Sequence, residues 1–314
     1  MKIAIVGTGG VGGYFGSRLA QAGCDVHFIA RGAHLQAMKE SGLKVESSLG
    51  DALIKPVNVS SDPASIGPVD FALVAVKLWD TEAAARSVKP LVGPHTAVIS
   101  LQNGVEKDAV LERFVNKANI VGGICYIAAS IRAPGIIEHA GKMARVVFGE
   151  MDRQRTPRCE ALLKALLDAG VTADLSLDIQ REIWEKFVFL VGLSATTSLI
   201  RLPIGPIRSD AFTRAVLLDA MDETVKVAIA KGIRIAPDYA ATRLEFCDTI
   251  PATMMSSMQI DLARGNRLEL DWLSGAVVRF GLELGVPTPV NRMVYAALKP
   301  HAAGRPAEAE GTAQ

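Results

Sequence analysis

The stretch "MKIAIVGTGGVGGYFGSRLA", residues 1–20, decides the fold of this chain. A short apolar, strand-like segment runs into closely spaced glycines, and a helical pattern follows them. The glycines fit G-x-G-x-x-G in the strand–turn–helix setting that a dinucleotide-binding fingerprint requires. Gly7 would make the tight turn, Gly9 would let the backbone approach a pyrophosphate, and Gly12 would let helix and strand pack closely. The alternative is a glycine-rich turn that serves packing alone. The predicted cofactor-binding residues of this loop are Gly7, Thr8, Gly9, Gly10, Val11 and Gly12.

Outward from this loop, apolar runs rich in β-branched residues alternate with helical stretches up to about residue 176. Several runs are apolar on both faces, which is typical of parallel strands covered by helices on each side. We therefore predict an α/β fold with an N-terminal Rossmann-type, doubly wound parallel sheet. Strands are expected at 2–7, 25–31, 69–77, 96–104 and 119–128, in "VTADLS", and as an antiparallel pair in "GIIEHAG" and "ARVVFGE"; helices are expected at 10–22, 80–90 and 106–114 and in "CEALLKALLDAG".

Strand patterns end at Asp178, and helical patterns fill 179–299. Long helices are expected in "SDAFTRAVLLDAMDETVKVAIAKG" and "LELDWLSGAVVRFGLELG". Thr288-Pro289 is typical of a helix start, a cap followed by proline at the first helical position. The sequence thus predicts a dinucleotide-binding domain over 1–177, an all-helical domain for substrate binding and dimerisation over 178–300, and a disordered tail over 301–314.

The composition excludes several classes of function. The 314 residues carry a net charge of +1 and only 5% are aromatic, so no nucleic-acid partner is expected. Cysteines and histidines are scattered without metal-ligand spacing, so no metal site is predicted. Mean hydropathy is high at +0.26, but the 14-residue uncharged gap between Lys186 and Arg201 is too short and too polar to span a membrane. The N-terminus lacks the features of a signal peptide, so a cytoplasmic protein is expected.

Arg31 follows the second predicted strand, where NAD-binding proteins place Asp or Glu against the ribose 2′-hydroxyl. A guanidinium suits a 2′-phosphate, which an acidic residue would repel, so the sequence favours NADP(H) over NAD(H). The alternative for Arg31 is a solvated charge at a strand end. Lys77 and Asn103 also end predicted strands, and ligands bind at the carboxyl edge of open α/β sheets. Either residue could instead be a polar residue that merely opens a loop.

Lys186 opens a run of apolar and small residues that contains no other charge. Burial of an ammonium is costly unless the group is paired or used. Leu190 would lie one turn further along the same helix face, with Ser194 beside that face. The alternative is an exposed i,i+4 pair between Lys186 and Glu182, but a helix so apolar is usually buried.

Two later stretches, "MMSSMQID" and "GNRLELDWLSG", carry further polar residues, among them Ser257 and Glu269. The alternative interpretation is helix capping. Ser256 with Gln259, and Asn266 with Glu269, have the spacing of a capping box. Periodicity alone does not choose between a cap and a catalytic group.

Taken together, these blocks resemble the ketopantoate reductase (2-dehydropantoate 2-reductase) family from Met1 to about Pro300. The likeness rests on the order and spacing of "GTGGVGGYFGSRLA" with Arg31, "VKLWDT", "LQNGVE", "WEKF", "SSMQIDLARGNRLELDWLSG" and "GVPTPVN". The resemblance implies a Rossmann domain followed by a helical domain, NADPH as cofactor, and a 2-oxo acid as substrate.

The resemblance also implies roles for single residues. Lys186 would be the general acid, Glu269 its acidic partner and a substrate contact, Ser257 a substrate-binding hydroxyl, and Asn103 an amide where nicotinamide and substrate meet. The chemistry agrees, because hydride addition to a keto carbon leaves an alkoxide that a nearby ammonium can stabilise and protonate. Glu269 would offset the cost of keeping Lys186 charged.

The chain departs from the family where the substrate is recognised. The family commonly has asparagines four and eight residues after the lysine, in the next loop, and shortly before the Ser-Ser pair; this chain has Leu190, Ser194, Ile204 and Met254. The leading prediction is NADPH-dependent reduction of ketopantoate to pantoate in pantothenate synthesis. The alternatives are reduction of a less polar 2-oxo acid and a non-catalytic NADP(H)-sensing module. A homodimer through the helical domain is a further hypothesis.

Overall fold

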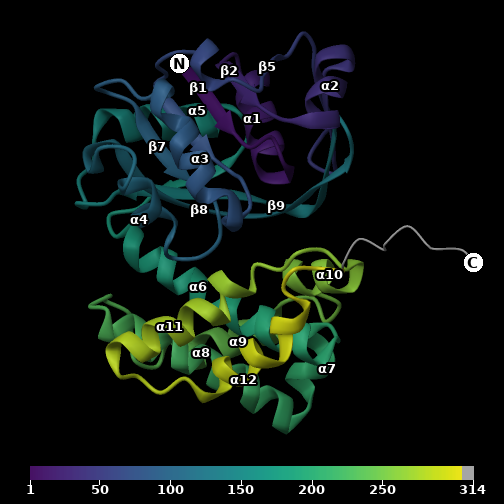
Figure 1. The fold of residues 1–314 in the computed structure, drawn as a ribbon, viewed down its shortest axis with the longest axis vertical. Coiled ribbons are helices and arrows are strands. Elements are labelled where there is room, and N and C mark those ends of the chain that lie inside the picture. The colour runs from purple at the N-terminus through teal and green to yellow at the C-terminus, as the bar shows by residue number, and fades with distance from the viewer. Residues whose placement is uncertain (306–314) are drawn as a thin grey trace, which may run out of the picture. The chain divides into compact units, whose positions relative to one another are not determined.

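The predicted strands lie in one ten-stranded sheet in the computed structural model, which describes residues 1–305 (Figure 1). The middle of the sheet is parallel, as expected: β1 pairs with β2 and β6, β6 with β7, and β7 with β8. The order is β4-β3-β9-β8-β7-β6-β1-β2-β5, and β10 also pairs with β9. The strands are β1 (Lys2–Val6), β2 (Asp25–Ile29), β3 (Leu43–Ser47), β4 (Ala52–Ile54), β5 (Asn58–Ser60), β6 (Phe71–Val74), β7 (Ala97–Ser100), β8 (Ile120–Ala133), β9 (Ile136–Glu150) and β10 (Thr172–Leu175).

The prediction of an antiparallel pair in residues 135–150 is wrong. The segments "GIIEHAG" and "ARVVFGE" do not pair with each other, because both belong to the single strand β9, whose antiparallel partner is β8. Gly141, with φ +78°, ends the first segment, but the register passes from Ala128–Ala140 to Ile127–Ala144. The intervening residues form a bulge in a continuing strand, where the sequence suggested a turn.

Helices cover both faces of the sheet, so β1 is buried on both sides as its apolar run predicts. α1, α2 and α5 cover one face and α3 and α4 the other. Gly16 of α1 shows how closely the layers approach, since a Cβ there would lie 2.5 Å from the Phe28 ring. The helices and 3₁₀ turns are α1 (Gly10–Gln21), α2 (Gly32–Ser41), α3 (Thr81–Val88), α4 (Lys107–Glu112), α5 (Pro157–Asp168), η1 (Pro63–Ser65), η2 (Leu78–Asp80), η3 (Lys89–Leu91) and η4 (Lys117–Asn119).

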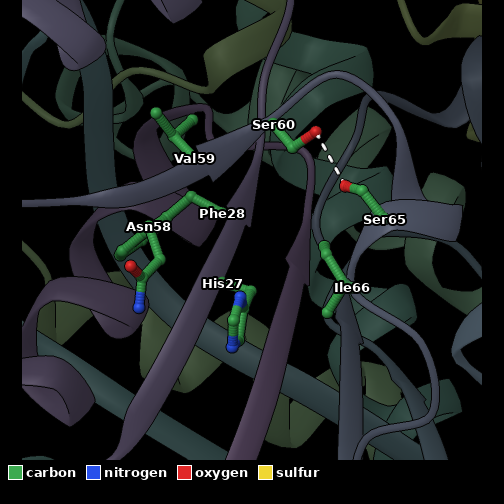
Figure 2. Close-up of a pocket in the computed structure, with 7 residues that line it drawn as sticks. All are labelled: His27, Phe28, Asn58, Val59, Ser60, Ser65 and Ile66. Atoms are coloured by element: carbon green, nitrogen blue, oxygen red, sulfur yellow. Dashed lines mark hydrogen bonds between the residues drawn. The ribbon is translucent and has the colours of Figure 1, made fainter.

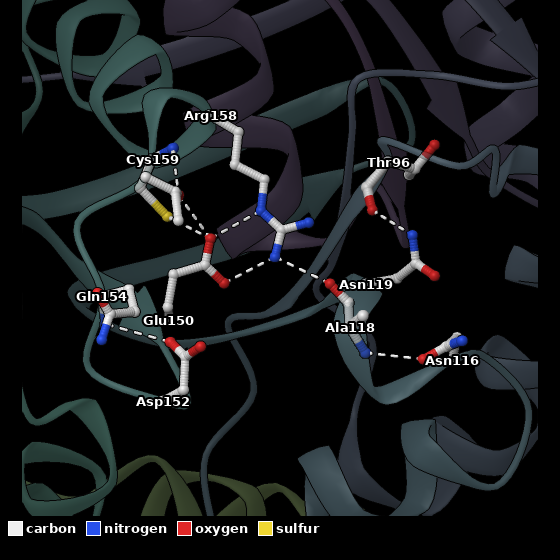
Figure 3. Close-up of polar contacts among 10 residues, drawn as sticks. Thr96, Asn116, Ala118, Asn119, Glu150, Asp152, Gln154, Arg158 and Cys159 are labelled. Carbon is white, nitrogen blue, oxygen red and sulfur yellow. Dashed lines mark hydrogen bonds and ion pairs between the residues drawn. The ribbon is translucent and has the colours of Figure 1, made fainter.

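A partly buried ion pair fixes the end of β9 (Figure 3). Arg158 donates to both oxygens of Glu150 at 2.7 Å and to the Ala118 carbonyl at 2.9 Å. The Thr156 hydroxyl donates to Glu150 at 2.6 Å and caps α5. Burial would raise the pKa of the Glu150 carboxyl, but the hydrogen bonds from Arg158 and Thr156 outweigh burial and hold that pKa below its ordinary value. Burial raises the pKa of the neighbouring Cys159 thiol to about 11.

The chain divides into two compact units, Met1–Glu182 and a second that begins at Ile183. The sequence placed this boundary at 177/178. The division lies later because the first turn of α6 packs on the sheet: a Cβ on Gly122 of β8 would lie 2.8 Å from Ile179. The second unit contains α6 (Ile179–Ile200) from Ile183 onwards, α7 (Ile204–Ser209), α8 (Ala211–Ala230), α9 (Tyr239–Thr249), α10 (Ser257–Arg264), α11 (Ser274–Leu284), α12 (Pro289–Leu298), η5 (Leu270–Trp272) and η6 (Lys299–His301).

From Ile183 to Arg305 the regular structure is helical, as predicted. α6 is long and apolar enough to span a membrane by length and composition alone, but 67% of that stretch is buried within the protein, as in the core helix of a soluble domain. Close packing explains the burial, since a Cβ on Gly192 would lie 2.4 Å from Met221 of α8.

Two details of the helical unit differ from the predictions. The segment "LELDWLSGAVVRFGLELG" is not one helix, because Leu273 is non-helical and separates η5 from α11. Pro289 opens α12 as expected, but the side chain of Thr288 makes no capping bond. The buried Glu223 carboxylate does so instead, accepting from the N–H groups of Val290 and Asn291 at 2.7 and 2.9 Å.

The predicted disordered tail begins at residue 301, and most of it, 306–314, lies outside the described residues. Its first residues are ordered. His301 ends η6, and the Arg305 N–H donates to the Gly265 carbonyl at 2.8 Å. This segment therefore packs against the loop that follows α10.

Candidate active site

Four adjacent strands bring together the residues that the sequence predicted for cofactor binding. In the order β2-β1-β6-β7, the loops after these strands carry Arg31, Gly7, Lys77 and Asn103. The strand ends are in register, because Val6 of β1 pairs with both Ile29 and Val74, and Val74 pairs with Ser100. The four loops therefore leave the same carboxyl edge of the sheet, which is where open α/β sheets bind ligands.

The glycine loop has the backbone geometry that its sequence predicts. Gly7 has φ +97°, a conformation that favours glycine. The N–H groups of Gly7 and Thr8 donate to the Ile29 carbonyl at 3.3 and 3.2 Å, and the Thr8 hydroxyl donates to the same oxygen at 3.0 Å. A Cβ on Gly12 would lie 2.2 Å from the Gly7 carbonyl oxygen and 2.8 Å from the Ile5 side chain of β1, so helix and strand pack closely at Gly12, as predicted.

The N-terminus of α1 is open to a ligand. Gly9 is its N-cap and supplies no side-chain capping bond, and a Cβ built on Gly9 would meet no atom within 4 Å. The N–H groups of a helix's first turn lack partners within the helix and form the positive end of its dipole. This helix N-terminus thus offers backbone donors with open space beside Gly9, an arrangement that fits a pyrophosphate.

Two exposed cations add positive charge to this edge. Arg31 is the N-cap residue of α2 and has an extended backbone. Lys77 follows β6, and its Nζ lies 5.6 Å from the ring centroid of Trp79. Both side chains can reach solvent, so they suit phosphate recognition better than a role in the core.

Asn103 is half-buried in the loop between β7 and α4. The following Gly104 has φ +80°, so the turn requires a glycine there. Sequence reasoning missed two buried polar residues that flank Asn103. Gln102 is 5% exposed and Lys107 only 1%. In the sequence they resemble ordinary loop residues, and no periodic signal marks them as buried.

In the helical unit, the three predicted residues of α6 are partly or fully buried. Lys186 and Leu190 are half-buried, and Ser194 is 1% exposed. The Ser194 hydroxyl has no hydrogen-bond partner among the described residues. A buried hydroxyl without a partner is costly, which makes this position a candidate for a bound water or ligand group.

The Ser256-Ser257 pair divides its roles. Ser256 caps α10, accepting the Gln259 N–H at 3.0 Å, so the capping interpretation is confirmed for this residue. Its hydroxyl also lies 2.8 Å from that of Thr197. Since Thr197 donates to the Leu193 carbonyl at 2.6 Å, Ser256 is the donor between them. Ser257 begins α10 and is exposed, so its hydroxyl is accessible to a ligand.

Glu269 precedes η5 and is 7% exposed. The Asn266–Glu269 capping interpretation is wrong, because no helix starts at Asn266; its side chain instead donates to Asp261 at 3.1 Å. A carboxylate as buried as that of Glu269 requires a cation or hydrogen-bond donors to be stable. The sequence marked it as notable without specifying its surroundings.

A polar cluster after Glu269 holds its loop in place. Asp271 accepts the Tyr295 hydroxyl at 2.7 Å and the Lys299 ammonium at 2.6 Å. Burial would raise the pKa of the Asp271 carboxyl, but the hydrogen bonds from Lys299 and Tyr295 outweigh burial and lower that pKa. The Leu268 N–H donates to the Ala302 carbonyl at 2.9 Å. Glu269 is therefore held on a loop fixed on both sides.

Two of the four residues that stand where the family commonly has asparagine lie together. The Ile204 N–H donates to the Met254 carbonyl at 3.0 Å. The Ile204 side chain is 0% exposed and packs in the helical core, while Met254 is half-buried. Met254 thus remains a candidate for lining a substrate site, whereas Ile204 contributes packing.

One open pocket lies apart from the predicted residues. It has a volume of about 190 Å³ and is lined by His27, Phe28, Asn58, Val59, Ser60, Ser65 and Ile66 (Figure 2). Ligand sites for molecules of drug size are usually 300–1,000 Å³, so this pocket is too small for a dinucleotide. Within residues 1–305, no group of three or more His, Cys, Asp or Glu side chains is placed to hold a metal ion.

Comparison with known proteins identifies the family of this chain. The family model described as Ketopantoate reductase PanE/ApbA matches residues 3–153, and that described as Ketopantoate reductase PanE/ApbA C terminal matches residues 178–302. A 2-dehydropantoate 2-reductase of Archaeoglobus fulgidus is 33% identical, covering 93% of this chain and 94% of its own length.

Solved structures share the whole fold. A PanE/ApbA family ketopantoate reductase from Ralstonia eutropha is 34% identical with a TM-score of 0.86, covering 96% of this chain and 98% of its own. A D-mandelate dehydrogenase bound to NADH and anilino(oxo)acetate shares the fold at 23% identity and a TM-score of 0.88, over 96% and 98% of the two chains. The chain therefore belongs to the ketopantoate reductase family and is an oxidoreductase of the 2-dehydropantoate 2-reductase type.

Proposed function

We propose that this protein reduces a 2-oxo acid to a 2-hydroxy acid with NADPH, in the cytoplasm and with ketopantoate as the leading substrate. The observation that carries this proposal is the carboxyl edge of the sheet, where an open, uncapped helix N-terminus lies beside the loop of Arg31. With ketopantoate as substrate, the step belongs to pantothenate synthesis. A homodimer through the helical unit remains part of the proposal.

The cofactor assignment depends on complementary charge. NADPH, when bound, supplies the hydride. Gly9, Gly10 and Val11 would hold its pyrophosphate with backbone N–H groups, and Arg31 would pair with the 2′-phosphate. Lys77 would add charge at the same edge. An acidic residue in place of Arg31 would have favoured NADH instead.

The residues of the helical unit would handle the proton and the carboxylate. Lys186 would stabilise the developing alkoxide and protonate it, leaving a neutral amine that recovers a proton from solvent. Glu269 would keep the Lys186 ammonium charged before the reaction. Ser257 would donate to the substrate carboxylate, and Asn103 would donate to the substrate where the cofactor meets it.

A second substrate class has specific support. Leu190 lies one turn beyond Lys186 and is half-buried, so it would present an apolar surface to the bound substrate. A leucine cannot hydrogen-bond a substrate hydroxyl, and an unpaired, desolvated hydroxyl costs about 1–3 kcal/mol. A 2-oxo acid with an apolar side chain is therefore the second candidate. A panel of 2-oxo acids, assayed by NADPH absorbance, ranks the two classes.

Substitution of Lys186 by alanine tests the proposed general acid. We expect Lys186→Ala to lower kcat by about 10²–10⁴-fold, the range for a positioned general acid, with NADPH affinity nearly unchanged. The matched control is Lys226→Ala, which removes an exposed lysine paired with Asp222 in the same unit. Steady-state kinetics with the best 2-oxo acid and NADPH titration provide the readouts. Near-normal turnover of Lys186→Ala would show that Lys186 is an ordinary helix charge.

A further inference from the structure

Two buried polar side chains surround the loop that carries Asn103. Lys107, at the start of α4, has a fully buried side chain. Its ammonium donates to the Ser100 carbonyl at 3.0 Å and to the Gly123 carbonyl at 2.9 Å, and it pairs with the Asp108 carboxylate at 3.2 Å. Because Ser100 ends β7 and Lys107 begins α4, this contact closes residues 101–106 into a ring anchored on β8.

Gln102 ties the same loop to its neighbour. Its side-chain NH₂ donates to the Thr81 hydroxyl at 2.8 Å and to the Lys77 carbonyl at 3.4 Å. Its side-chain oxygen accepts from the Ser100 hydroxyl at 2.9 Å. Gln102 therefore joins the loop after β6, which carries Lys77, to the loop after β7, which carries Asn103.

A buried ion pair and a buried amide are expensive ways to stabilise a loop, because apolar residues of similar volume are often as stable or more so. What such groups do supply is a fixed geometry, since each partner tolerates little displacement. The hydrogen bonds of the Gln102 and Lys107 side chains reach the end of β7, the Lys77 loop, the start of α3, β8 and Asp108. Their position fits a site that must hold one amide in place.

We infer that Gln102 and Lys107 are positioning residues, a buried polar brace that fixes the Asn103 loop relative to the Lys77 loop for catalysis. This inference rests on the proposed function, in which Asn103 contacts the substrate. Gln102 and Lys107 touch neither cofactor nor substrate in this scheme. They act by holding Asn103.

The chain offers a matched control for Gln102. Asn119 is a buried amide in the same unit that donates to the Thr96 carbonyl at 2.7 Å (Figure 3). It also donates to the Gly93 carbonyl at 3.2 Å. It ties β7 and β8 at their amino ends, at the opposite edge of the sheet. Gln102→Met and Asn119→Met each remove a buried amide, and only the first disturbs the Asn103 loop.

The experiment compares kcat, the substrate KM, the NADPH Kd and the melting temperature of both variants. We expect both to melt earlier, and Gln102→Met alone to lower kcat by about 10- to 100-fold, since a displacement of 1 Å can cost 10²-fold. The KM should rise less than kcat falls, and the NADPH Kd should stay close to that of the wild type. The double variant Lys107→Met/Asp108→Asn, which leaves no unpaired buried charge, should show the same pattern.

Hydrogen exchange provides a readout that does not depend on activity. Amides in residues 101–106 should exchange faster in Gln102→Met than in Asn119→Met. Equal exchange of this loop in the two variants, or equal kcat, overturns the brace. A wild-type protein that reduces no 2-oxo acid overturns the proposed function instead, and loop exchange then still decides whether the brace exists.

Discussion

A single side chain, Arg31, carries the proposed choice between the two nicotinamide cofactors. The structure places it beside the glycine loop, because β1 and β2 are paired in register to Val6 and Ile29. Its guanidinium can form charge-assisted hydrogen bonds to a 2′-phosphate, a group that NADH lacks. The contribution of Arg31 to cofactor affinity should therefore depend on which cofactor is bound.

Arg31→Ala should weaken NADPH binding far more than NADH binding. Charge-assisted hydrogen bonds contribute about 1.5–3 kcal/mol, or about 10- to 150-fold in affinity. Lys39→Ala, which removes another exposed cation from α2, is the control and should leave both affinities unchanged. Fluorescence titration with the two cofactors measures the difference. Equal weakening of NADH and NADPH would contradict the assignment.

At the residue scale, the sequence singled out candidate site residues but did not reveal which polar side chains are buried. Lys186 stood out because it opens an apolar run, Asn103 because it ends a predicted strand, and Glu269 through the family resemblance. Lys107 did not, since a lysine after a glycine turn normally lies in solvent, and only the tertiary fold brings the carbonyls of Ser100 and Gly123 around it. Burial of a single polar residue is a property of the whole fold, so local sequence does not reveal it.

At the scale of an element, two neighbouring glycines in the turn between β1 and α1 have different surroundings, so one substitution should affect ligand binding and the other folding. Gly9 and Gly10 are neighbours, but a Cβ on Gly9 would meet nothing within 4 Å, whereas one on Gly10 would lie 2.1 Å from the Ala129 carbonyl oxygen. Gly9 has φ −82°, which alanine also adopts. The space beside Gly9 is therefore available to a ligand, and the space beside Gly10 is occupied by β8.

Gly9→Ala should fold normally but bind NADPH poorly, whereas Gly10→Ala should fold poorly. Alanine is a worse N-cap than glycine, so Gly9→Ala should cost about 1 kcal/mol or less of stability. Its methyl group would occupy the space proposed for the pyrophosphate and weaken NADPH binding. Gly10→Ala must move α1 away from β8 and should melt much earlier. Melting curves with and without NADPH distinguish the two, and a Gly9→Ala protein with normal affinity would show that the loop serves packing only.

Helix α6 carries the residues proposed to determine substrate specificity. Lys186, Leu190 and Ser194 follow at one-turn intervals, so a change at Leu190 should affect the substrate more than the proton donor. Ser194 is buried with an unpaired hydroxyl among the described residues, and a bound water there could serve a polar substrate group. Substitution of Leu190 tests whether this residue or Ser194 controls the choice of substrate.

Leu190→Asn should shift the ratio of kcat/KM values toward ketopantoate, relative to an apolar 2-oxo acid, by about tenfold, in line with one recovered hydrogen bond. Leu202→Asn, at an exposed leucine after α6, is the control and should leave the ratio unchanged. If the wild type already prefers ketopantoate over every apolar analogue, the missing contact is supplied elsewhere, with Ser194 the first residue to test.

At the scale of the whole molecule, the parallel middle of the sheet followed from apolar runs that alternate with helices. The outer strands did not. Residues 32–68 contain α2 and the strands β3, β4 and β5, which lack the long apolar runs that mark the equally short central strands. β9 pairs with β3 at Ile136–His139 and with β10 at Arg145–Phe148, long-range contacts that no local pattern encodes.

The division into two units leads to a test of where the cofactor acts. Residues 1–182 have their own hydrophobic clusters on both faces of the sheet, so they can be stabilised by a ligand that binds them alone. NADPH at 100 times its Kd should stabilise this unit by about 2.7 kcal/mol, which slows exchange through global opening about 100-fold.

Core amides of β1 and β6 should therefore become strongly protected on NADPH addition, while those of α8, in the helical unit, should change much less. Hydrogen exchange read by mass spectrometry resolves these peptides separately. Lys186→Ala should show the same protection of β1 and β6, because it removes a proton donor and no contact with the dinucleotide. Equal slowing in α8 would mean that the two units open as one. Absence of protection in β1 would place the cofactor away from the glycine loop, and the assignment of Gly9 and Arg31 would fail with it.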